Sequence, residues 1–191
     1  MPAFLGDKIK DALQWAVPFS GVCFRNVSLQ YANRQDIISA QGSINAGGRF
    51  NLKGAFDILY LSCDLHACLE ETTKSLQRPG FEVAMLLPCT IVGIEVKLSL
   101  VLDLTKGVTR RKLGITKKSL IADDWEKRQN VDNQEAYTQQ IGRLAREAGF
   151  EAILIPSAVT RGKNLDIFPD RLLLGSSLKV VNRHLLPLPK R

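Results

Sequence analysis

The residues in this chain that are best suited to chemistry lie beside predicted strand ends and glycine-rich turns. They are Arg25, Arg49, Tyr60, Glu70 and Ser157. The planar arginine fork binds phosphate or carboxylate oxygens through paired hydrogen bonds, and a carboxylate can stabilise a positive charge that develops during a reaction. Taken singly, each residue is more simply interpreted as a surface ion pair, a half-buried strand residue or a turn cap. A catalytic role must therefore be argued from the whole set.

Standard catalytic and metal-binding motifs are absent from the sequence. It contains no GxSxG, P-loop, GxGxxG or HExxH pattern. Its four cysteines form no CxxC pair, and His66, which lies between Cys63 and Cys68, has only His184 as a further histidine. A zinc site needs three or four ligands at compatible positions. We therefore expect free thiols and no metal site.

Hydrophobic spacing predicts three helices that would position the candidate residues. Apolar residues recur at intervals of three and four over residues 4–17 and 134–148, and a third helix is predicted over residues 65–76, before Arg78-Pro79-Gly80. Asp64 is placed to cap the second helix at its N-terminus, while Pro18 and Gly149 mark the ends of the other two.

Short apolar runs predict most of the remaining structure as strands. These runs cover residues 21–25, 58–62, 82–87, 91–98, 100–104, 151–155, 165–168 and 178–182. Residues 31–46 are polar and mixed and predict a loop with one short helix. Gly47 and Gly48 predict a sharp turn or a close approach of backbone to a ligand. Clustered strands with few helices indicate the α+β class.

Composition indicates one soluble domain. The chain has 191 residues, of which 45% are hydrophobic and 24% charged, and its net charge is 26 − 19 = +7. No apolar run approaches the roughly 20 residues of a membrane span. The first residues lack the charged-then-apolar order of a signal peptide. We therefore expect a cytoplasmic protein.

The excess positive charge is densest between Lys106 and Lys118, a stretch without any acid. Nucleic-acid binding would favour aromatic residues interleaved for base stacking, and this stretch has none. A solvated basic loop is therefore the preferred interpretation. A small anionic ligand, or an acidic protein segment covering a cationic cleft, stays open.

Taken in order, several short motifs resemble those of the RES-domain family, which is named for an arginine, a glutamate and a serine. They are Phe24-Arg25; Gly48-Arg49-Phe50-Asn51 with Gly54; Tyr60-Leu61-Ser62; Ala67 with Glu70; Pro156-Ser157; and Asn164-Leu165 with Phe168. The matches span residues 24–168, and the ordered combination is what makes them specific. Spacing from Ala67 selects Glu70, although helical geometry alone does not separate it from Glu71.

The resemblance implies a fold like that of the ADP-ribosyltransferase toxins, with a split central sheet around an NAD⁺ cleft. It also implies a single domain over residues 1–191, with a helical extension at residues 1–20 and a flexible tail at residues 184–191. Characterised relatives consume NAD⁺, several by phosphorolysis to nicotinamide and ADP-ribose-1″-phosphate. Many are toxins silenced by a small antitoxin protein. NAD⁺ would thus be the substrate rather than a cofactor, with inorganic phosphate as co-substrate.

Roles for individual residues follow from this resemblance and from the chemistry of N-glycosidic cleavage. Glu70 would stabilise the oxocarbenium-like transition state. Arg25 and Arg49 would bind the phosphates, together with backbone N–H groups at Gly48 and with Asn51 from the same turn. Tyr60 would stack on the nicotinamide or its ribose, and Ser157 would offer a hydroxyl to a phosphate oxygen or to an incoming phosphate nucleophile.

Three other interpretations stay open at this point. Water could replace phosphate as the acceptor, which would make the protein an NAD⁺ glycohydrolase. The same cleft could transfer ADP-ribose to a macromolecule. The chain could instead be a non-catalytic, basic nucleic-acid-binding module. A membrane partner is not expected, and a homo-oligomer is left open.

Overall fold

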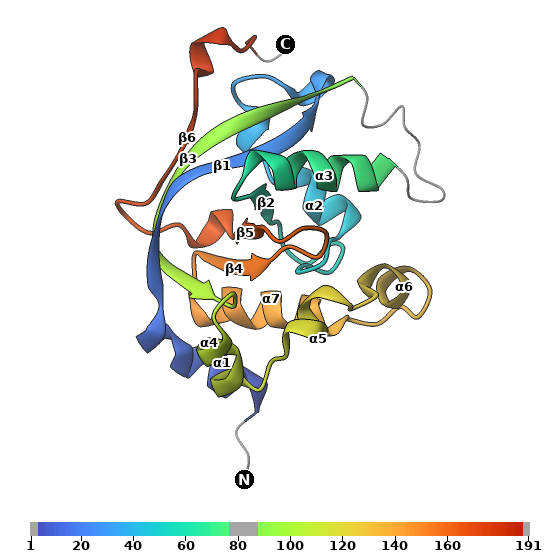
Figure 1. Ribbon diagram of the computed structural model, residues 1–191, viewed down its shortest axis with the longest axis vertical. Helices are drawn as coiled ribbons and strands as arrows, with labels where there is room; N and C mark the ends of the chain where they lie inside the picture. Colours follow the sequence, from blue (N-terminus) through green and yellow to red (C-terminus); the bar gives the residue numbers. More distant parts are fainter. Residues whose placement is uncertain (1–3, 77–87, 189–191) are drawn as a thin grey trace.

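The computed structural model describes residues 4–76 and 88–188. Its two longest strands are antiparallel neighbours that run along much of the molecule (Figure 1). β1 (Val17–Ser28) pairs with β3 (Cys89–Asp103) from one end of β1 to the other. The strand predicted at residues 21–25 is therefore the middle of a longer one. The strands predicted at 91–98 and 100–104 are one continuous strand. The strand predicted at 82–87 lies outside the described residues.

A buried carboxylate explains why β3 does not break near residue 99. Both oxygens of Glu151, which is 0% exposed, accept backbone hydrogen bonds. Oε2 accepts from the N–H groups of Ser99 and Leu100 at 2.7 and 2.8 Å, and Oε1 accepts from Leu173. These bonds satisfy backbone donors where the pairing with β1 shifts register, so the strand continues through the irregularity.

The strand pairings form a closed circuit. The remaining strands are β2 (Leu59–Ser62), β4 (Ala152–Pro156), β5 (Lys163–Ile167) and β6 (Ser177–Val180). Pairings lead from β1 through β2, β5, β4 and β3 back to β1, and β6 adds to β3. Only β3 and β4 pair in parallel among the described strands. The predicted α+β class, with a central sheet and flanking helices, is confirmed.

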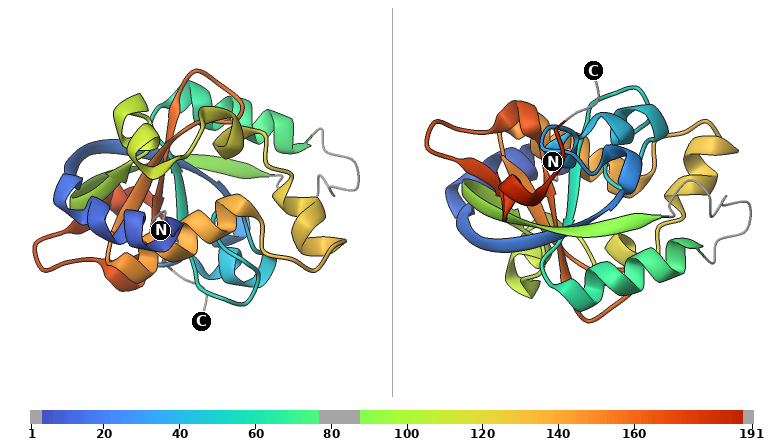
Figure 2. Two further views of the ribbon diagram at one scale, coloured as in Figure 1. Left: turned by 90° about the horizontal axis from the view of Figure 1, so that it is seen from below. Right: turned by 90° about the horizontal axis from the view of Figure 1, so that it is seen from above.

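Helices pack on and beside this sheet. They are α1 (Leu5–Asp11), α2 (Gln41–Ala46), α3 (Leu65–Leu76), α4 (Gly107–Leu113), α5 (Lys117–Ile121), α6 (Trp125–Asn130) and α7 (Tyr137–Ala148). α3 packs on β1 and β2, whereas α7 lies on β4 and contacts α1, α5 and α6. Figure 2 shows α1 lying alongside α7.

Two hydrophobic clusters lie on opposite faces of the strands. Along β4, Ile153 and Ile155 belong to one cluster, with α1 and α7, while Ala152 and Leu154 belong to the other. This alternation is the two-residue period of a strand buried on both faces. Tyr60 packs against the α7 cluster, whereas its neighbours Leu59 and Leu61 belong to the other cluster. The polar residues of β2 and β5 discussed below therefore face the α7 side.

Residues 106–118 are not the loop that was predicted, although most of their basic side chains are exposed as expected. This segment contains α4 and the first residues of α5. Arg110 Nη1 donates to the carbonyls of Leu104 and Thr105 at 2.7 and 2.8 Å, and Leu113 and Ile115 are buried. Apolar residues at the end of the segment thus hold it against the core, while most of its basic side chains stay on the surface.

Both ends of the described chain are in contact with the domain. The helix predicted at residues 4–17 is α1 followed by a 3₁₀ turn at Ala12–Trp15, and it packs on α7 through Ile9 and Leu144. At the other end, Arg34 donates to the carbonyls of His184 and Leu186 at 3.1 and 3.0 Å. The start of the predicted tail is therefore fastened to the loop after β1. Within the described residues, no helix is long and apolar enough to cross a membrane.

We predict that Gly142→Ala destabilises the fold. Gly142 lies in α7, and a Cβ there would be 1.9 Å from the carbonyl oxygen of Phe50. Because backbone cannot move aside as a side-chain end can, we expect a loss of about 3 kcal/mol in the free energy of unfolding. Urea denaturation measures it.

The matched control is Gly42→Ala in α2, where a Cβ would meet nothing within 4 Å. It should leave stability unchanged or raise it by up to about 1 kcal/mol through helix propensity. Equal midpoints for the two variants would contradict the packing of α7 on the turn that contains Phe50.

Candidate functional site

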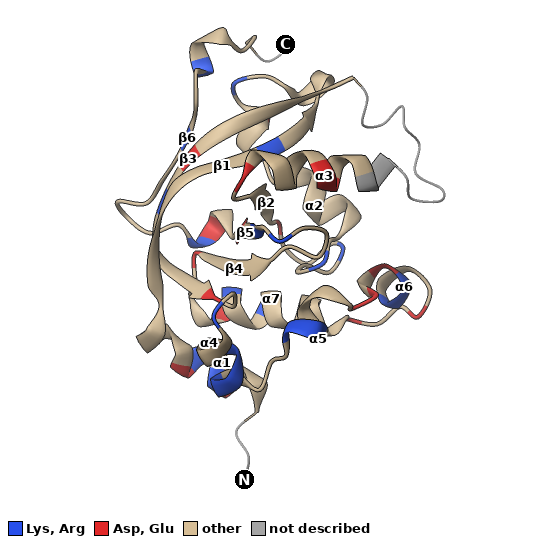
Figure 3. Cartoon of the chain, viewed as in Figure 1, with Lys and Arg blue, Asp and Glu red and all other residues tan. Residues whose placement is uncertain are grey.

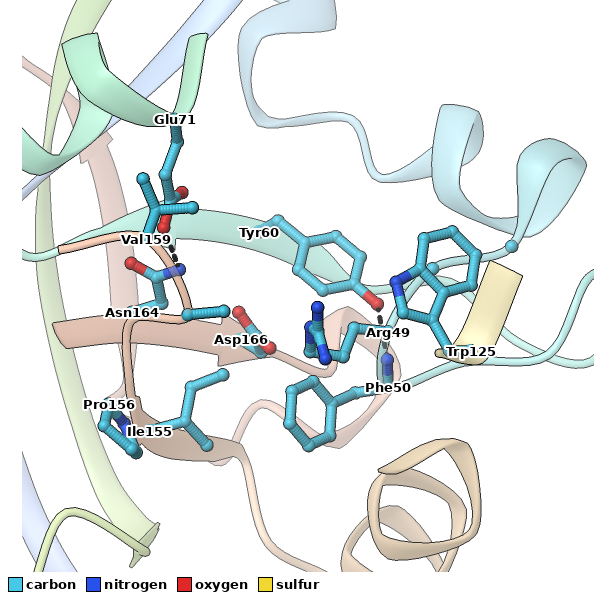
Figure 4. Close-up of a pocket in the computed structure, with 13 residues that line it drawn as sticks. Arg49, Phe50, Tyr60, Glu71, Trp125, Ile155, Pro156, Val159, Asn164 and Asp166 are labelled. Carbon is cyan, nitrogen blue, oxygen red and sulfur yellow. Dashed lines mark hydrogen bonds between the residues drawn. The ribbon is translucent and has the colours of Figure 1, made fainter. Parts of the chain in front are cut away.

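A pocket of about 560 Å³ opens where the glycine turn, β2, β5, the end of β4, α3 and α6 meet (Figure 4). Its wall combines charged groups with aromatic and aliphatic side chains. This volume and this mixed lining are typical of small-molecule sites. The residues that line the pocket lie between positions 47 and 166. The site depends on the closed circuit of strand pairings because these pairings bring the distant segments together.

Glu71 is the acid that α3 places in this pocket. Its Oε1 accepts hydrogen bonds from Ser157 Oγ and Asn164 Nδ2, both at 2.8 Å. Its Oε2 accepts from Ser62 Oγ at 3.3 Å. Three side chains from β2, β5 and the loop after β4 therefore fix the orientation of one carboxylate. Such a preorganised charge is suited to stabilising a positive charge nearby.

The choice of Glu70 as the catalytic acid is corrected by this arrangement. Glu70 lies on the outer side of α3, where its Oε1 is 3.4 Å from His66 Nδ1 and its side chain is 45% exposed. Successive helix residues point about 100° apart, so only one of two adjacent acids can face the sheet. Ala67 and Cys68 are both buried. The predicted acid was chosen three residues after a buried small residue, Ala67. The same spacing counted from Cys68 would have selected Glu71.

Ser157 positions Glu71 and does not itself line the pocket. Its hydroxyl donates to Glu71 and accepts from the backbone N–H groups of Val159 and Thr160 at 3.1 and 3.2 Å. The side chain is 4% exposed. The predicted contact between Ser157 and a ligand phosphate is therefore replaced by a hydrogen bond to the acid.

Arg49 lies in the pocket wall and also fastens the segment between α5 and α6. Its Nη1 donates to the carbonyl of Asp123 at 3.1 Å and approaches those of Leu120 and Ile121 at 3.4 and 3.5 Å. Burial raises the pKa of the nearby Asp166 carboxyl, and the positive charge of the Arg49 guanidinium partly opposes that rise. Arg49 therefore lines the pocket, and its contact with an anionic ligand stays a prediction.

The glycine turn brings backbone close to Tyr60. Gly47 has φ +75°, a left-handed conformation that favours glycine. A Cβ at Gly48 would be 2.4 Å from the Tyr60 hydroxyl oxygen. That hydroxyl accepts from the N–H of Phe50 at 3.1 Å and donates to Asn51 Oδ1 at 2.7 Å. Tyr60 therefore presents its ring to the pocket while its hydroxyl holds the turn.

Asn51 supports the turn from behind and does not line the pocket. It is 0% exposed, and its amide nitrogen donates to the carbonyls of Ser43 and Phe56 at 2.8 and 2.9 Å. The predicted direct contact of Asn51 with NAD⁺ is therefore corrected to a structural role.

Arg25 lies on the other side of Glu71, beside a second cavity. Its Nη1 donates to the carbonyls of Ile37 and Ser39, and burial lowers its pKa. This cavity of about 280 Å³ is also lined by Tyr60, Glu71 and Asn164, which it shares with the main pocket. Each of the two predicted arginines therefore lines a cavity that Glu71 also lines.

Asp166 is a pocket residue that the sequence analysis missed. It is 1% exposed, and neither carboxyl oxygen has a hydrogen-bond partner among the described residues. Burial, and next the charge of Glu71, raise the pKa of Asp166 well above its ordinary value. In the sequence, Asp166 stands in the apolar run LDIF, which gives no sign of a functional acid. Only the pairing of β5 shows that its side chain faces the pocket.

Charge and thiol distribution do not suggest a second centre. Lysine and arginine gather on α4 and α5, whereas α3 carries acids and α6 carries residues of both signs (Figure 3). All four cysteines are free. In the part of the chain that the structure describes, no group of three or more His, Cys, Asp or Glu residues could hold a metal ion.

The chain is similar to several known proteins. The model of the RES domain family matches residues 23–186. NAD(+) phosphorylase MbcT of Mycobacterium tuberculosis is 26% identical over 164 residues, which cover 85% of this chain and 83% of that protein. MbcT of Mycobacterium bovis matches equally. The crystal structure of the M. tuberculosis MbcT–MbcA toxin–antitoxin complex superposes with a TM-score of 0.69 at 20% identity, over 94% of this chain and 92% of that one.

We predict that Asp166 makes the protein less stable as pH rises. Its folded-state pKa is raised, so the folded protein keeps a proton that the unfolded chain releases above about pH 4. The free energy of unfolding should fall by about 1.4 kcal/mol per pH unit from this group until its folded pKa is reached. Glu71 and Cys63 raise that pKa, and Arg49 lowers it.

Asp166→Asn removes the titration and is close in size. Urea denaturation of both proteins at pH 5 and pH 8 should show the wild type losing stability relative to the variant. If the free energies of unfolding of wild type and variant differ by the same amount at both pH values, the raised pKa of Asp166 is contradicted.

Proposed function

Because the chain belongs to the RES domain family, we propose that it degrades NAD⁺ by cleaving the bond between nicotinamide and ribose. The observation that carries this proposal is the Glu71 carboxylate, held by Ser62, Ser157 and Asn164 in a pocket that also contains Arg49. The similarity to NAD(+) phosphorylase MbcT supports it. We further propose phosphorolysis, which yields nicotinamide and ADP-ribose-1″-phosphate.

Cleavage of this bond requires few catalytic groups, and the pocket residues can supply them. Nicotinamide in NAD⁺ carries a positive charge and leaves as a neutral molecule, so no general acid is required. Positive charge then develops on the ribose, as in glycoside cleavage. The fixed carboxylate of Glu71 would stabilise that charge and hold the sugar hydroxyls.

Substrate binding would use the aromatic and cationic parts of the pocket. Tyr60, Trp125 and Phe50 line it together with Arg49. Aromatic faces suit a flat pyridinium ring, and the arginine fork suits the dinucleotide phosphates. Backbone N–H groups of the Gly47–Gly48 turn would add donors.

The second cavity offers a route for an anionic acceptor. Arg25 and Glu71 both line it, whereas Arg49 lines the main pocket. An inorganic phosphate bound there would approach the ribose already ionised and would need no general base. Neither cavity is lined by a histidine, and water would need such activation.

The proposed physiological role is that of a toxin silenced by an antitoxin. The solved relative with a TM-score of 0.69 is a toxin–antitoxin complex, and we propose a comparable partner that covers the pocket. Such a toxin would act on the NAD⁺ of the cytoplasm. We also propose an ADP-ribosyltransferase-like fold, supported by β3, whose residues 94–97 pair with β6 and 101–103 with β4.

Transfer of ADP-ribose to a macromolecule is the second candidate. It would favour a second acid beside the catalytic one, and Asp166 is such an acid. However, Asp166 is only 1% exposed, which is too deep to meet a macromolecular acceptor. Phosphorolysis is therefore better supported.

A timed incubation of purified protein with NAD⁺, with and without inorganic phosphate, tests the proposal by mass spectrometry of the products. We expect nicotinamide and ADP-ribose-1″-phosphate only when phosphate is present. Free ADP-ribose regardless of phosphate would make water the acceptor. Intact NAD⁺ after incubation with folded, inhibitor-free protein would overturn the proposal.

The two adjacent acids of α3 provide a matched pair of variants. Glu71→Gln should lower kcat by about 100- to 1000-fold, because it removes the charge opposite the developing cation. Glu70→Gln should stay within about twofold of wild type, because its side chain lies outside the pocket. Steady-state rates of nicotinamide release measure both. Loss of activity in Glu70→Gln alone would refute the placement of the acid.

A further inference from the structure

Asp166 and Tyr60 form a facing pair in the floor of the pocket. They are direct partners in the antiparallel pairing of β2 with β5. Side chains of such a pair lie on the same face with Cβ atoms about 4.5–5.5 Å apart. Both residues line the pocket, and Figure 4 shows the Asp166 carboxyl beside the ring of Tyr60. A flat ring stacked on Tyr60 would therefore have one edge at Asp166.

The carboxyl of Asp166 lacks the partners that buried polar groups normally have. It is 1% exposed, and both of its oxygens are without a hydrogen bond among the described residues. Leaving a buried polar group unsatisfied is costly, and most such groups in folded proteins are paired. A ligand that enters the pocket could supply both missing hydrogen bonds at once.

The charged surroundings decide which hydrogen bonds this carboxyl offers. Glu71 and Cys63 disfavour its ionised form and Arg49 favours it, with burial as the largest influence, so its pKa is well above the ordinary value. Glu71 differs, because its oxygens accept from Ser62, Ser157 and Asn164. A protonated carboxyl presents one donor and one acceptor side by side.

We propose that Asp166 recognises the primary carboxamide of the nicotinamide ring. This inference rests on the proposed function, and it assigns the deep end of the pocket to the leaving group. The Asp166 O–H would donate to the carboxamide oxygen, and the carboxamide N–H would donate to the other Asp166 oxygen. The ring would lie on Tyr60, with the scissile bond directed toward Glu71.

The same contact would favour bond cleavage. When the glycosidic bond breaks, its electron pair returns to the ring nitrogen and the pyridinium becomes neutral. Electron density on the carboxamide oxygen rises in that step, so a donor to that oxygen gains strength in the transition state. No proton is transferred. Asp166 thus determines leaving-group specificity, while Glu71 acts on the ribose.

The test compares NAD⁺ with 3-acetylpyridine adenine dinucleotide, in which a methyl ketone replaces the carboxamide and no N–H is available. Variants are Asp166→Leu, which removes both hydrogen bonds, and Asp166→Asn, which keeps one donor and one acceptor. Asp170→Asn is the control, since Asp170 bonds to Arg146 at the surface outside the pocket. Thermal melting confirms that each variant is folded.

We expect Asp166→Leu to lower kcat/KM for NAD⁺ by about 10- to 100-fold and to shift the NAD⁺-to-analogue preference by about tenfold toward the analogue. Asp166→Asn and the control should keep the wild-type preference. A general loss of packing would lower kcat/KM for both substrates by the same factor. An unchanged preference in Asp166→Leu therefore overturns the inference while leaving the proposed function intact.

Binding of free nicotinamide separates this inference from the proposed function. If wild-type protein does not consume NAD⁺, the proposed function fails, and ligand-observed NMR with nicotinamide decides the role of Asp166. Binding at least tenfold weaker in Asp166→Leu than in Asp166→Asn supports the inference. Equal binding, or none by the wild type, overturns it.

Discussion

The arrangement of the site depends on the three hydrogen bonds that hold the Glu71 carboxylate. Their donors, Ser62, Ser157 and Asn164, lie up to 102 positions apart in the chain, as 164 − 62 shows. They meet because β5 pairs with β2 on one side and with β4 on the other. Any shift of register by one residue would turn Asn164 to the opposite face. The closed strand circuit is therefore what keeps a charged group oriented in a half-buried position.

The opposite wall of the pocket is held by buried glutamine side chains. Gln139 Nε2 donates to the carbonyl of Gly48 at 3.0 Å and to Gln129 Oε1 at 3.0 Å, while Gln129 Nε2 donates to the carbonyl of Ala46 at 3.1 Å. These bonds satisfy backbone groups of the glycine turn that would otherwise be buried without partners. They also join α6 and α7 to the turn, so Arg49 and Trp125 are positioned by the same network.

The pocket contains two carboxyl groups in different environments, and this difference suits them to different tasks. Glu71 accepts hydrogen bonds from side chains, whereas Asp166 lies deeper and has raised pKa. Pairs of acids separated in this way are a common source of divided roles in enzyme sites. Keeping Asp166 buried with no hydrogen-bond partner among the described residues lowers stability, and this is consistent with a group retained for ligand binding rather than for folding.

The sequence by itself determined the α+β class, the start of α3, the C-terminal end of α7 and the family resemblance, since local periodicity, capping residues such as Asp64 and ordered motifs are all readable along the chain. It did not determine that β3 is continuous, because the groups that satisfy its irregularity come from Glu151, far along the chain. It also could not separate Glu70 from Glu71, or show that Asn51 and Ser157 support the site from behind and that Asp166 faces into it. Only tertiary structure decided these points, because which way a polar side chain faces depends on pairing partners distant in sequence.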